Sequence, residues 1–424
     1  MKRFIGFLAA LIAMTLIISG CGTDSMKDIE TKRAEYEEQF ANILVEYDGG
    51  TITQFDAMAS FVSQYSTYAQ YYNAYGIQMD DNVIELLKKM AMESVLQSRV
   101  LETEFDRRGM ELDRTAEEIR AEVEEAYQKN FDYFMSLSTA NDEEVKNAEA
   151  SLSMYANGIT IDSMVADTIM VEKATALMND IKDEITDVDE ETVEDAYRNT
   201  IEENKTAYEG NPSKAEKDAT SEGTVLCWLP TDYKAVKHIL IKPESELMNA
   251  LISLRQQLKA AKTSDGSEDL ETLEASIHEA ETACLENVRE KTDAVYERLS
   301  NGEKFEEIMA ELGEDPGMKR EPTLTNGYYV SEGSTTWDPY FVEGALALEK
   351  IGDYSERPVI SSSGVHIIYL CGELKAGEVP YEDVKDTLYA LALEDLKEQH
   401  FSEYLEKEVS KLNPVYHNEN WTIV

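Results

Sequence analysis

The sequence is short of positive charge and of cysteine, and each shortage excludes a class of protein. It has 39 lysines and arginines against 85 aspartates and glutamates, a formal net charge of −46. A chain of this charge repels phosphate backbones and anionic headgroups, so nucleic acid is not expected as a partner. Its four cysteines form no CxxC pair and have no metal-ligand spacing, so no metal site is predicted. The remaining composition, 42% hydrophobic and 29% charged residues over 424 positions, is typical of a globular protein with two or three domains.

The amino-terminal residues predict a location outside the cytoplasm. Two basic residues precede an uncharged apolar run from Phe4 to Ile18, which has the size of a secretory signal core and is short for a bilayer span. The run ends in Ile18-Ser19-Gly20-Cys21, which resembles a bacterial lipobox. That resemblance implies a signal peptide over residues 1–20, a diacylglyceryl group on Cys21 and a tether over residues 21–40. The chain is then expected to be extracytoplasmic and lipid-anchored to the cell membrane; an ordinary signal peptide with an unrelated cysteine is the alternative.

An odd number of thiols remains if Cys21 is acylated. They are Cys227, Cys284 and Cys371. At least one of them is then free or pairs between chains, which leaves a homodimer open. A disulfide between Cys227 and Cys371 also stays open, although buried, unreactive thiols are the expectation.

The first half of the chain predicts an all-helical domain over residues 41–209. A short strand and a Gly49-Gly50 turn come first, and a helix is expected to begin at Thr53. Apolar residues then recur at helical spacing through several long segments, and Thr115 with Glu118 forms a capping-box pattern.

A tyrosine-rich stretch in this domain allows two interpretations. Its members, at near-helical spacing, are Tyr65, Tyr68, Tyr71, Tyr72 and Tyr75. One interpretation is a groove that receives unfolded polypeptide segments, and the other is a packed helix face.

The second half of the chain changes to short β-branched strands around helices, which predicts an α+β domain. Residues 210–231 are expected to link the two domains, and the α+β domain is expected over residues 232–373. A helical hairpin at 245–289 is predicted within it. A last helix over residues 380–412 is expected to pack back on the first domain. The predicted fold class is therefore α+β: a helical domain, completed by the last helix, into which an α+β domain with a helical-hairpin insertion is inserted.

Four ordered segments of the second half resemble the parvulin family of peptidyl-prolyl isomerases. They are "VKHILI" (236–241), "LSNGEKFEEIMAELGED" (299–315), "YFVEGALALEKIGDYSERPVISSSGVHIIYL" (340–370) and "VPYEDVKDTL" (379–388). The helical domain is similar to the chaperone domains of SurA and PrsA, and with the lipobox the whole chain resembles a PrsA-like foldase lipoprotein. Two features depart from the family pattern: the helical hairpin, and "REPTLTNGYYVSEGSTTW" in place of a glycine-rich strand entry.

The parvulin resemblance implies a site built on two histidines. His238 and His366 match family histidines that lie side by side on central strands, and Ser363 matches a family hydroxyl position. Asp315 falls where parvulins have a cysteine or aspartate that faces the prolyl bond. Each has a plainer alternative: histidines that only support the core, and an aspartate that only makes the turn of "EDPG".

The same resemblance places the substrate proline against aromatic residues. Phe341 and Trp337, the latter in place of the usual methionine, are expected to form the proline pocket; ordinary core packing is the alternative. Tyr328 and Tyr329 lie on the strand that shapes this pocket, so they are included among the substrate-binding residues.

Together these expectations describe a lipid-anchored foldase outside the cytoplasm. Its partners would be newly exported, unfolded polypeptides, and its reaction would be the cis/trans isomerisation of X-Pro bonds. Because no covalent bond changes, the reaction needs no nucleophile, metal or cofactor. The alternative function is a holdase, in which the altered "TNGYY" segment has removed the activity and the domain only binds peptide.

Overall fold

The structure, a computed structural model, describes residues 25–263 and 270–422. The predicted signal peptide and the lipobox cysteine, Cys21, lie outside the described residues, as does most of the predicted turn of the helical hairpin. Among the helices that are described, none combines the length and the apolar composition that a membrane span requires.

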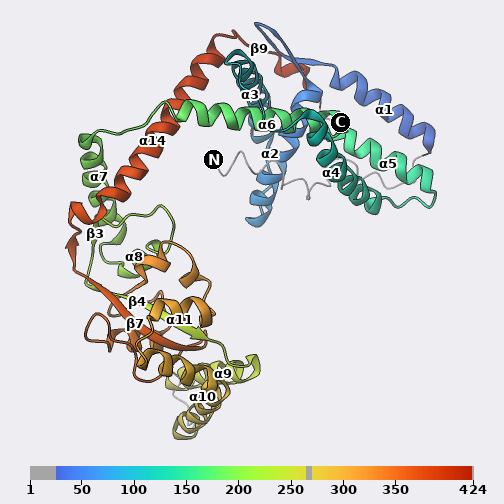
Figure 1. Cartoon of the computed structure of the whole chain (residues 1–424). Coiled ribbons are helices and arrows are strands. Elements are labelled where there is room, and N and C mark those ends of the chain that lie inside the picture. The colour runs from blue at the N-terminus through green and yellow to red at the C-terminus, as the bar shows by residue number, and fades with distance from the viewer. Residues whose placement is uncertain (1–24, 264–269, 423–424) are drawn as a thin grey trace. The chain divides into compact units, whose positions relative to one another are not determined.

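The chain forms two compact units. Met1–Thr186 together with Asp395–Val424 make the first, called the helical unit, and Asp187–Glu394 make the second, called the α+β unit. The predicted fold class is confirmed, because the sheet with the two histidine strands is confined to the second unit (Figure 1).

The helical unit consists of long helices with one small sheet. Its helices are α1 (Met26–Phe40), α2 (Gln54–Ala74), α3 (Asp81–Arg107), α4 (Ala116–Leu137), α5 (Glu143–Ala156), α6 (Ile161–Lys182), the carboxyl-terminal part of α14 (Tyr381–Ser410) and the 3-10 helix η3 (Asn418–Asn420). Its strands are β1 (Ile43–Tyr47), β2 (Gly50–Thr53) and β9 (Val415–Tyr416), in the order β2-β1-β9. Capping boxes at Thr53 and Thr115 fix the starts of α2 and α4, and both helices begin where the sequence predicted.

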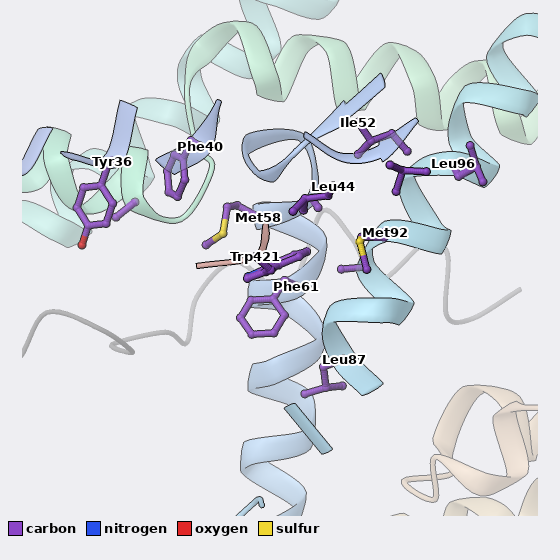
Figure 2. Packing of buried hydrophobic residues seen from close by; sticks show 14 of the residues in the cluster. Tyr36, Phe40, Leu44, Ile52, Met58, Phe61, Leu87, Met92, Leu96 and Trp421 are labelled. Atoms are coloured by element: carbon purple, nitrogen blue, oxygen red, sulfur yellow. The ribbon is translucent and has the colours of Figure 1, made fainter. Parts of the chain in front are cut away.

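The carboxyl terminus closes the core of the helical unit. Strand β9 pairs with β1, and the Trp421 ring lies 5.3 Å from the ring of Phe61 on α2. Figure 2 shows Trp421 against Phe61 and close to Met58, with Leu87 and Met92 of the neighbouring helix α3 beside them in the same core. The core therefore needs the last residues of the chain as well as its first half.

The tyrosine-rich stretch lies on α2 and just beyond its end, and it divides into two parts. Tyr65 and Tyr68 pack against the core, as a packed helix face would. Tyr71 and Tyr75 are 62% and 66% exposed. These last two tyrosines, with Ile77 beside them at 56%, leave an apolar surface facing solvent.

The α+β unit surrounds a four-stranded antiparallel sheet. Its helices are α7 (Glu190–Tyr208), α8 (Pro212–Asp218), α9 (Ser245–Thr263), α10 (Leu270–Ser300), α11 (Phe305–Leu312), the 3-10 helix η2 (Gly317–Lys319), α12 (Thr323–Asn326), α13 (Pro339–Leu346) and the first part of α14. Its strands are β3 (Trp228–Leu229), β4 (Tyr233–Ile241), β5 (Tyr328–Val330), β6 (Val359–Ile360), β7 (Val365–Leu374) and β8 (Gly377–Glu378). The sheet order is β5-β4-β7-β6, and β3 pairs separately with β8.

Alternation along β4 and β7 gives the sheet two different faces. Ile239, Ile241 and Ile367 point to one face, where they pack with α9, α10 and α11. Val236 and Ile368 point to the other face, where they pack with α13. Because alternate residues share a face, His238 and His366 belong with the second set.

The boundary between the units differs from the predicted one. Helix α7 was expected in the helical domain, yet it belongs to the α+β unit, which begins at Asp187. Val193 and Ile201 of α7 pack with Cys227 and with Leu388 of α14. The predicted division at residue 209 is therefore wrong, because a helical pattern does not reveal which core a helix joins.

The predicted linker is a folded part of the α+β unit. Residues 210–231 include α8 and β3, and Ala215 and Glu216 of α8 are fully buried. Helix α14 also differs from its prediction. Its Leu388 packs within the α+β unit, and only its later part, around Tyr404, packs in the helical unit.

The helical hairpin is present, but its second helix is longer than predicted. Helix α10 continues past residue 289 to Ser300, because Val295 keeps the apolar spacing and is fully buried. Arg255 of α9 attaches the hairpin to the sheet, since its Nη2 donates to the Ile360 carbonyl at 3.1 Å. The insertion therefore packs on the α+β unit as part of its core.

Candidate active site

The strand register brings the two histidines together. Leu240 of β4 is paired with His366 of β7, and His238 is paired with Ile368, so the histidines are diagonal neighbours on one face. Their ring centroids are 4.9 Å apart and their Nδ1 atoms are 2.9 Å apart. Both side chains are almost completely buried, at 3% and 4% exposure.

A continuous series of hydrogen bonds runs through the pair. His238 Nε2 lies 2.8 Å from Asp315 Oδ2, and at the other end His366 Nε2 lies 2.6 Å from Ser361 Oγ. The Tyr328 hydroxyl also donates to Asp315 Oδ2, at 2.9 Å. The series Ser361–His366–His238–Asp315 is called the relay below.

One placement of protons satisfies every polar atom of the relay. Ser361 donates its hydroxyl proton to His366 Nε2, His366 Nδ1–H donates to His238 Nδ1, and His238 Nε2–H donates to the carboxylate of Asp315. Ser361 Oγ in turn accepts the backbone N–H of Ser363 at 2.9 Å. His366 is neutral in this arrangement, which avoids an unpaired charge in a buried site.

Burial controls the protonation of His366. It lowers the pKa of this imidazole well below the ordinary 6.5, and the neighbouring His238 lowers it further, while the charge of Asp315 opposes both. The second histidine is therefore neutral at physiological pH, as the proton placement requires.

Asp315 combines a turn with a contact to the histidines. Its Oδ1 accepts the backbone N–H of Gly317 at 2.9 Å, which forms the turn that "EDPG" predicted, and its Oδ2 faces His238 and Tyr328. Burial opposes ionisation, but the hydrogen bonds from His238, the Gly317 N–H and the Tyr328 hydroxyl together lower the pKa of Asp315 to about 2. The site therefore holds a fixed negative charge.

Close approach at Asp315 requires a glycine two residues later. A Cβ atom on Gly317 would lie 1.9 Å from the hydroxyl oxygen of Tyr328. The Tyr328–Asp315 hydrogen bond thus depends on the missing side chain at 317.

Three aromatic side chains, Phe341, Tyr328 and Trp337, pack around the relay. The Phe341 ring is 5.2 Å from the His238 ring and 5.1 Å from the His366 ring, both edge-on. Trp337 stacks on Tyr328 with centroids 4.4 Å apart, and its Nε1 donates to the Tyr329 carbonyl at 2.7 Å. Phe341 is only 4% exposed, so it forms the floor, while Trp337 and Tyr328 are half-buried and reach the surface.

A pocket of about 570 Å³ opens beside Tyr328 and Trp337. Its lining residues are Thr220, Glu222, Gly317, Arg320, Glu321, Thr323, Tyr328 and Trp337. The pocket lies next to the Asp315 turn, since Gly317 belongs to both. Its walls offer aromatic surface and charges of both signs, which suits a short peptide segment.

Two of the predicted site residues lie elsewhere. The hydroxyl that contacts His366 is that of Ser361, and Ser363 joins the relay only through its backbone N–H. Tyr329 points to the opposite side of β5 from Tyr328 and packs with Tyr233 and Leu229. Ser361 was missed because it is the first of three consecutive serines before Gly364, and only the geometry of the turn shows which hydroxyl reaches the histidine.

The cysteines stand apart from the relay. Cys227 and Cys284 are buried and Cys371 is half-buried, and all three are free thiols. Burial raises the pKa of Cys227 to about 11, which keeps its thiol protonated and unreactive. Within the described ranges, no group of three or more His, Cys, Asp or Glu side chains is arranged to hold a metal ion.

Known proteins share this part of the chain. Residues 238–372 match the rotamase family, described as the PPIC-type PPIase domain. A Helicobacter pylori protein provisionally named a peptidyl-prolyl cis-trans isomerase is 24% identical over 275 residues, which are 64% of this chain and 87% of that protein.

Solved structures similar to this chain include proteins that its sequence was expected to resemble. PrsA from Bacillus anthracis is 19% identical, with 79% of this chain and 99% of that chain covered and a TM-score of 0.20. A SurA-like chaperone of Campylobacter jejuni is 12% identical, with 89% and 99% covered and a TM-score of 0.29.

The matched segment begins at His238 and ends at Gly372, within β7. It therefore contains both histidines, Asp315 and the three aromatic residues around the relay. The chain therefore carries a peptidyl-prolyl cis-trans isomerase domain of the PPIC type, the parvulin domain that its sequence predicted, over residues 238–372.

Proposed function

We propose that this protein is a lipid-anchored foldase outside the cytoplasm, which binds newly exported, unfolded polypeptides and accelerates the cis/trans isomerisation of their X-Pro bonds. The observation that carries the isomerase part is the relay, which ends at an ionised Asp315 beside an aromatic pocket. The other parts of the proposal are supported separately below.

The proposed reaction requires only that the site binds a twisted amide better than a planar one. Rotation about an X-Pro bond meets a barrier of roughly 20 kcal/mol, because rotation removes the amide resonance. Resonance places negative charge on the carbonyl oxygen. A fixed carboxylate near that oxygen disfavours the planar form more than the twisted form, so Asp315 would lower the barrier when the substrate carbonyl lies beside it.

The remaining residues would hold the substrate and the charge in place. Trp337 and Tyr328 offer flat apolar surface for the proline ring, and Tyr328 also holds Asp315 by its hydroxyl. The histidines do not reach the surface, so their proposed role is to fix the carboxylate through the relay. On this proposal His238 and His366 position the acid and exchange no proton with the substrate.

The lipid anchor rests on the amino-terminal sequence. Cys21 follows Ile18-Ser19-Gly20, and the first described helix begins at Met26 with a capping box at Ser25. Mass spectrometry of the protein from membranes of a bacterial host should show a diacylglyceryl group on the peptide that begins at Cys21. A Cys21→Ser variant that stays in the membrane fraction to the same extent would contradict the anchor.

Client binding is supported by the apolar surface of the helical unit. Tyr71, Tyr75 and Ile77 are all more than half exposed. The core side of α2 is formed by Phe61 and its neighbours, so these three residues are not needed for the core. Clusters of exposed aromatic side chains are typical of surfaces that hold other polypeptides. A Tyr71→Ser, Tyr75→Ser double variant should lose the ability to delay aggregation of an unfolded client.

A prolyl exchange assay tests the isomerase part. The chain is added to short X-Pro peptides, and cis/trans exchange is followed by NMR at several temperatures. Acceleration by the parent chain and its loss in a folded Asp315→Ala variant would support the proposal. An inactive parent would contradict it.

One observation favours the second candidate function, a holdase. The Tyr328 hydroxyl occupies Asp315 Oδ2, and Trp337 covers Tyr328, so the acid is partly shielded from a substrate. If the parent chain binds proline peptides and prevents aggregation without accelerating exchange, the domain is a binding module.

A further inference from the structure

A buried carboxylate outside the matched domain contacts the loop before Trp337. Glu216 of α8 is 0% exposed, and its Oε1 accepts both the backbone N–H and the hydroxyl of Ser331, at 2.8 and 2.6 Å. Its Oε2 accepts the Ser334 hydroxyl at 2.5 Å. A carboxylate without solvent is costly unless hydrogen bonds satisfy it, so this contact strongly selects one position of the loop.

A second residue of α8 fixes the rest of the same loop. The hydroxyl of Ser213 accepts the backbone N–H of Thr335 at 2.8 Å, and the Ser213 carbonyl accepts the Thr336 hydroxyl at 2.7 Å. Residues 331–336 are thus attached to α8 at both ends. The next residue is Trp337, which stacks on Tyr328.

The chain that follows α8 reaches the pocket itself. Thr220 and Glu222 line it together with Trp337 and Arg320. Glu222 is exposed, so its charge is available to a bound peptide. Thr220 and Glu222 therefore form part of the pocket wall, while Ser213 and Glu216 hold the loop before Trp337, and all four lie before the first residue of the family match at 238.

We propose that residues 212–222 form a wall of the substrate site, in which Glu216 is a positioning residue for Trp337 and Glu222 selects the charge of the residues that flank the substrate proline. This inference rests on the proposed isomerase function of the pocket. It assigns substrate selection to a segment outside the matched isomerase domain.

Substitution of Glu216 tests the positioning role in the full chain. Glu216→Ala removes the acceptor of Ser331 and Ser334, and it should raise KM for X-Pro peptides by about tenfold while kcat stays near the parent value, because the relay is untouched. Glu216→Gln keeps an acceptor for the Ser331 N–H and should restore most of the affinity. Asp232→Asn is the matched control, since Asp232 also accepts a backbone N–H, that of Ala376 at 2.8 Å, away from the pocket.

The split between KM and kcat separates positioning from a general structural role. A variant that is only partly folded loses kcat in proportion to its active fraction and keeps its KM. Equal KM values for the parent and a folded Glu216→Ala variant would overturn the positioning role.

Glu222→Lys tests the wall without disturbing a buried residue. Peptides with lysine, alanine or glutamate beside the proline are compared by kcat/KM, and the variant should shift the ratio of lysine to glutamate peptides about fivefold toward glutamate. An unchanged ratio would overturn the proposed selection. This measurement decides the proposal on its own if Glu216→Ala does not fold.

Failure of the proposed function gives a different result. If the parent chain accelerates no peptide, the isomerase proposal fails, and the wall is then judged from the Kd of fluorescein-labelled proline peptides. A shifted charge preference in Glu222→Lys by that measure would support the wall even without catalysis, and an unchanged preference would overturn it.

Discussion

Replacement of Asp315 by asparagine is the sharpest test of the site. Asparagine keeps the shape of the side chain and an oxygen for the Gly317 N–H, but it places an N–H₂ donor where Oδ2 now accepts His238 and Tyr328. The His238 N–H and the Tyr328 O–H would then both point at the N–H₂ group of the new amide, which cannot accept a hydrogen bond. His238 would have to reverse its protons, and with it the whole relay would reverse, which leaves the Ser361 hydroxyl proton without its acceptor.

The size of the effect follows from the pKa of Asp315. Its neighbours lower that pKa from 3.8 to about 2. At about 1.4 kcal/mol per unit, they stabilise the charged form by about 2 kcal/mol relative to the unfolded chain. Because the pKa is lowered on folding, this stability is present above pH 3.8 and is lost as the pH falls toward 2. Asp315→Asn should therefore unfold about 2 kcal/mol more easily at pH 7, with a difference that shrinks below pH 4.

The same variant should lose isomerase activity. Removal of a fixed charge beside the reacting amide should lower kcat/KM by about 10- to 100-fold, which corresponds to about 1.4 to 2.8 kcal/mol. The assay is cis/trans exchange on X-Pro peptides, with thermal unfolding to confirm that the variant is folded.

The adjacent acid supplies the control for this experiment. Glu314 accepts the Lys242 N–H at 3.0 Å and pairs with Lys291, and it does not contact the histidines. Glu314→Gln should keep the activity of the parent. A folded Asp315→Asn variant as active as Glu314→Gln would refute the reasoning, and Asp315 would then serve only the turn.

Three further predictions concern the relay and its surroundings. Ser361→Ala should destabilise the protein by about 1 to 2 kcal/mol in denaturant unfolding, because it leaves His366 Nε2 buried without a donor, whereas Ser363→Ala should have little effect; equal effects would contradict the relay. Gly317→Ala should displace Tyr328 and cost about 1 to 3 kcal/mol, and an unchanged melting temperature would show that the close approach is not needed. Because burial lowers the pKa of His366, the unfolded chain binds a proton at this histidine before the folded chain does, and the free energy of unfolding should fall as the pH drops below 6.5. His366→Gln should lose less of that free energy between pH 7 and 5. An identical loss would exclude this histidine as the cause.

Local patterns were sufficient for much of the helical unit. The Gly49-Gly50 turn predicted the helix start at Thr53, and the capping-box pattern predicted the start at Thr115, because both features are local in the chain. The core that these helices join was not predictable in the same way. Helix α7 joins the α+β unit through Val193 and Ile201, and nothing in a helical repeat states which partner its apolar face will meet.

The last residues of the chain show the same limit. The sequence predicted a final helix, but not that Trp421 would return to the core beside Phe61. Such a contact joins residues far apart in the chain, so no local pattern carries it.

The sequence by itself determined which side chains are available for the candidate site. His238 and His366 stand in strand patterns and Asp315 in a turn pattern, and these local signals, with the family resemblance, were sufficient to name them. Only the tertiary structure decided how they are connected. The strand register placed the histidines as diagonal neighbours, and the geometry of the loop before β7 chose Ser361 over Ser363.

The shape of the pocket was decided by the tertiary structure. The alternation of β5 sent Tyr328 toward Asp315 and Tyr329 away from it, and the buried Glu216 attached an apparent linker to the loop before Trp337. Hydrogen bonds of this kind form between segments that meet only after the chain has folded. A sequence fixes which side chains are available for them, and the three-dimensional arrangement fixes which ones touch.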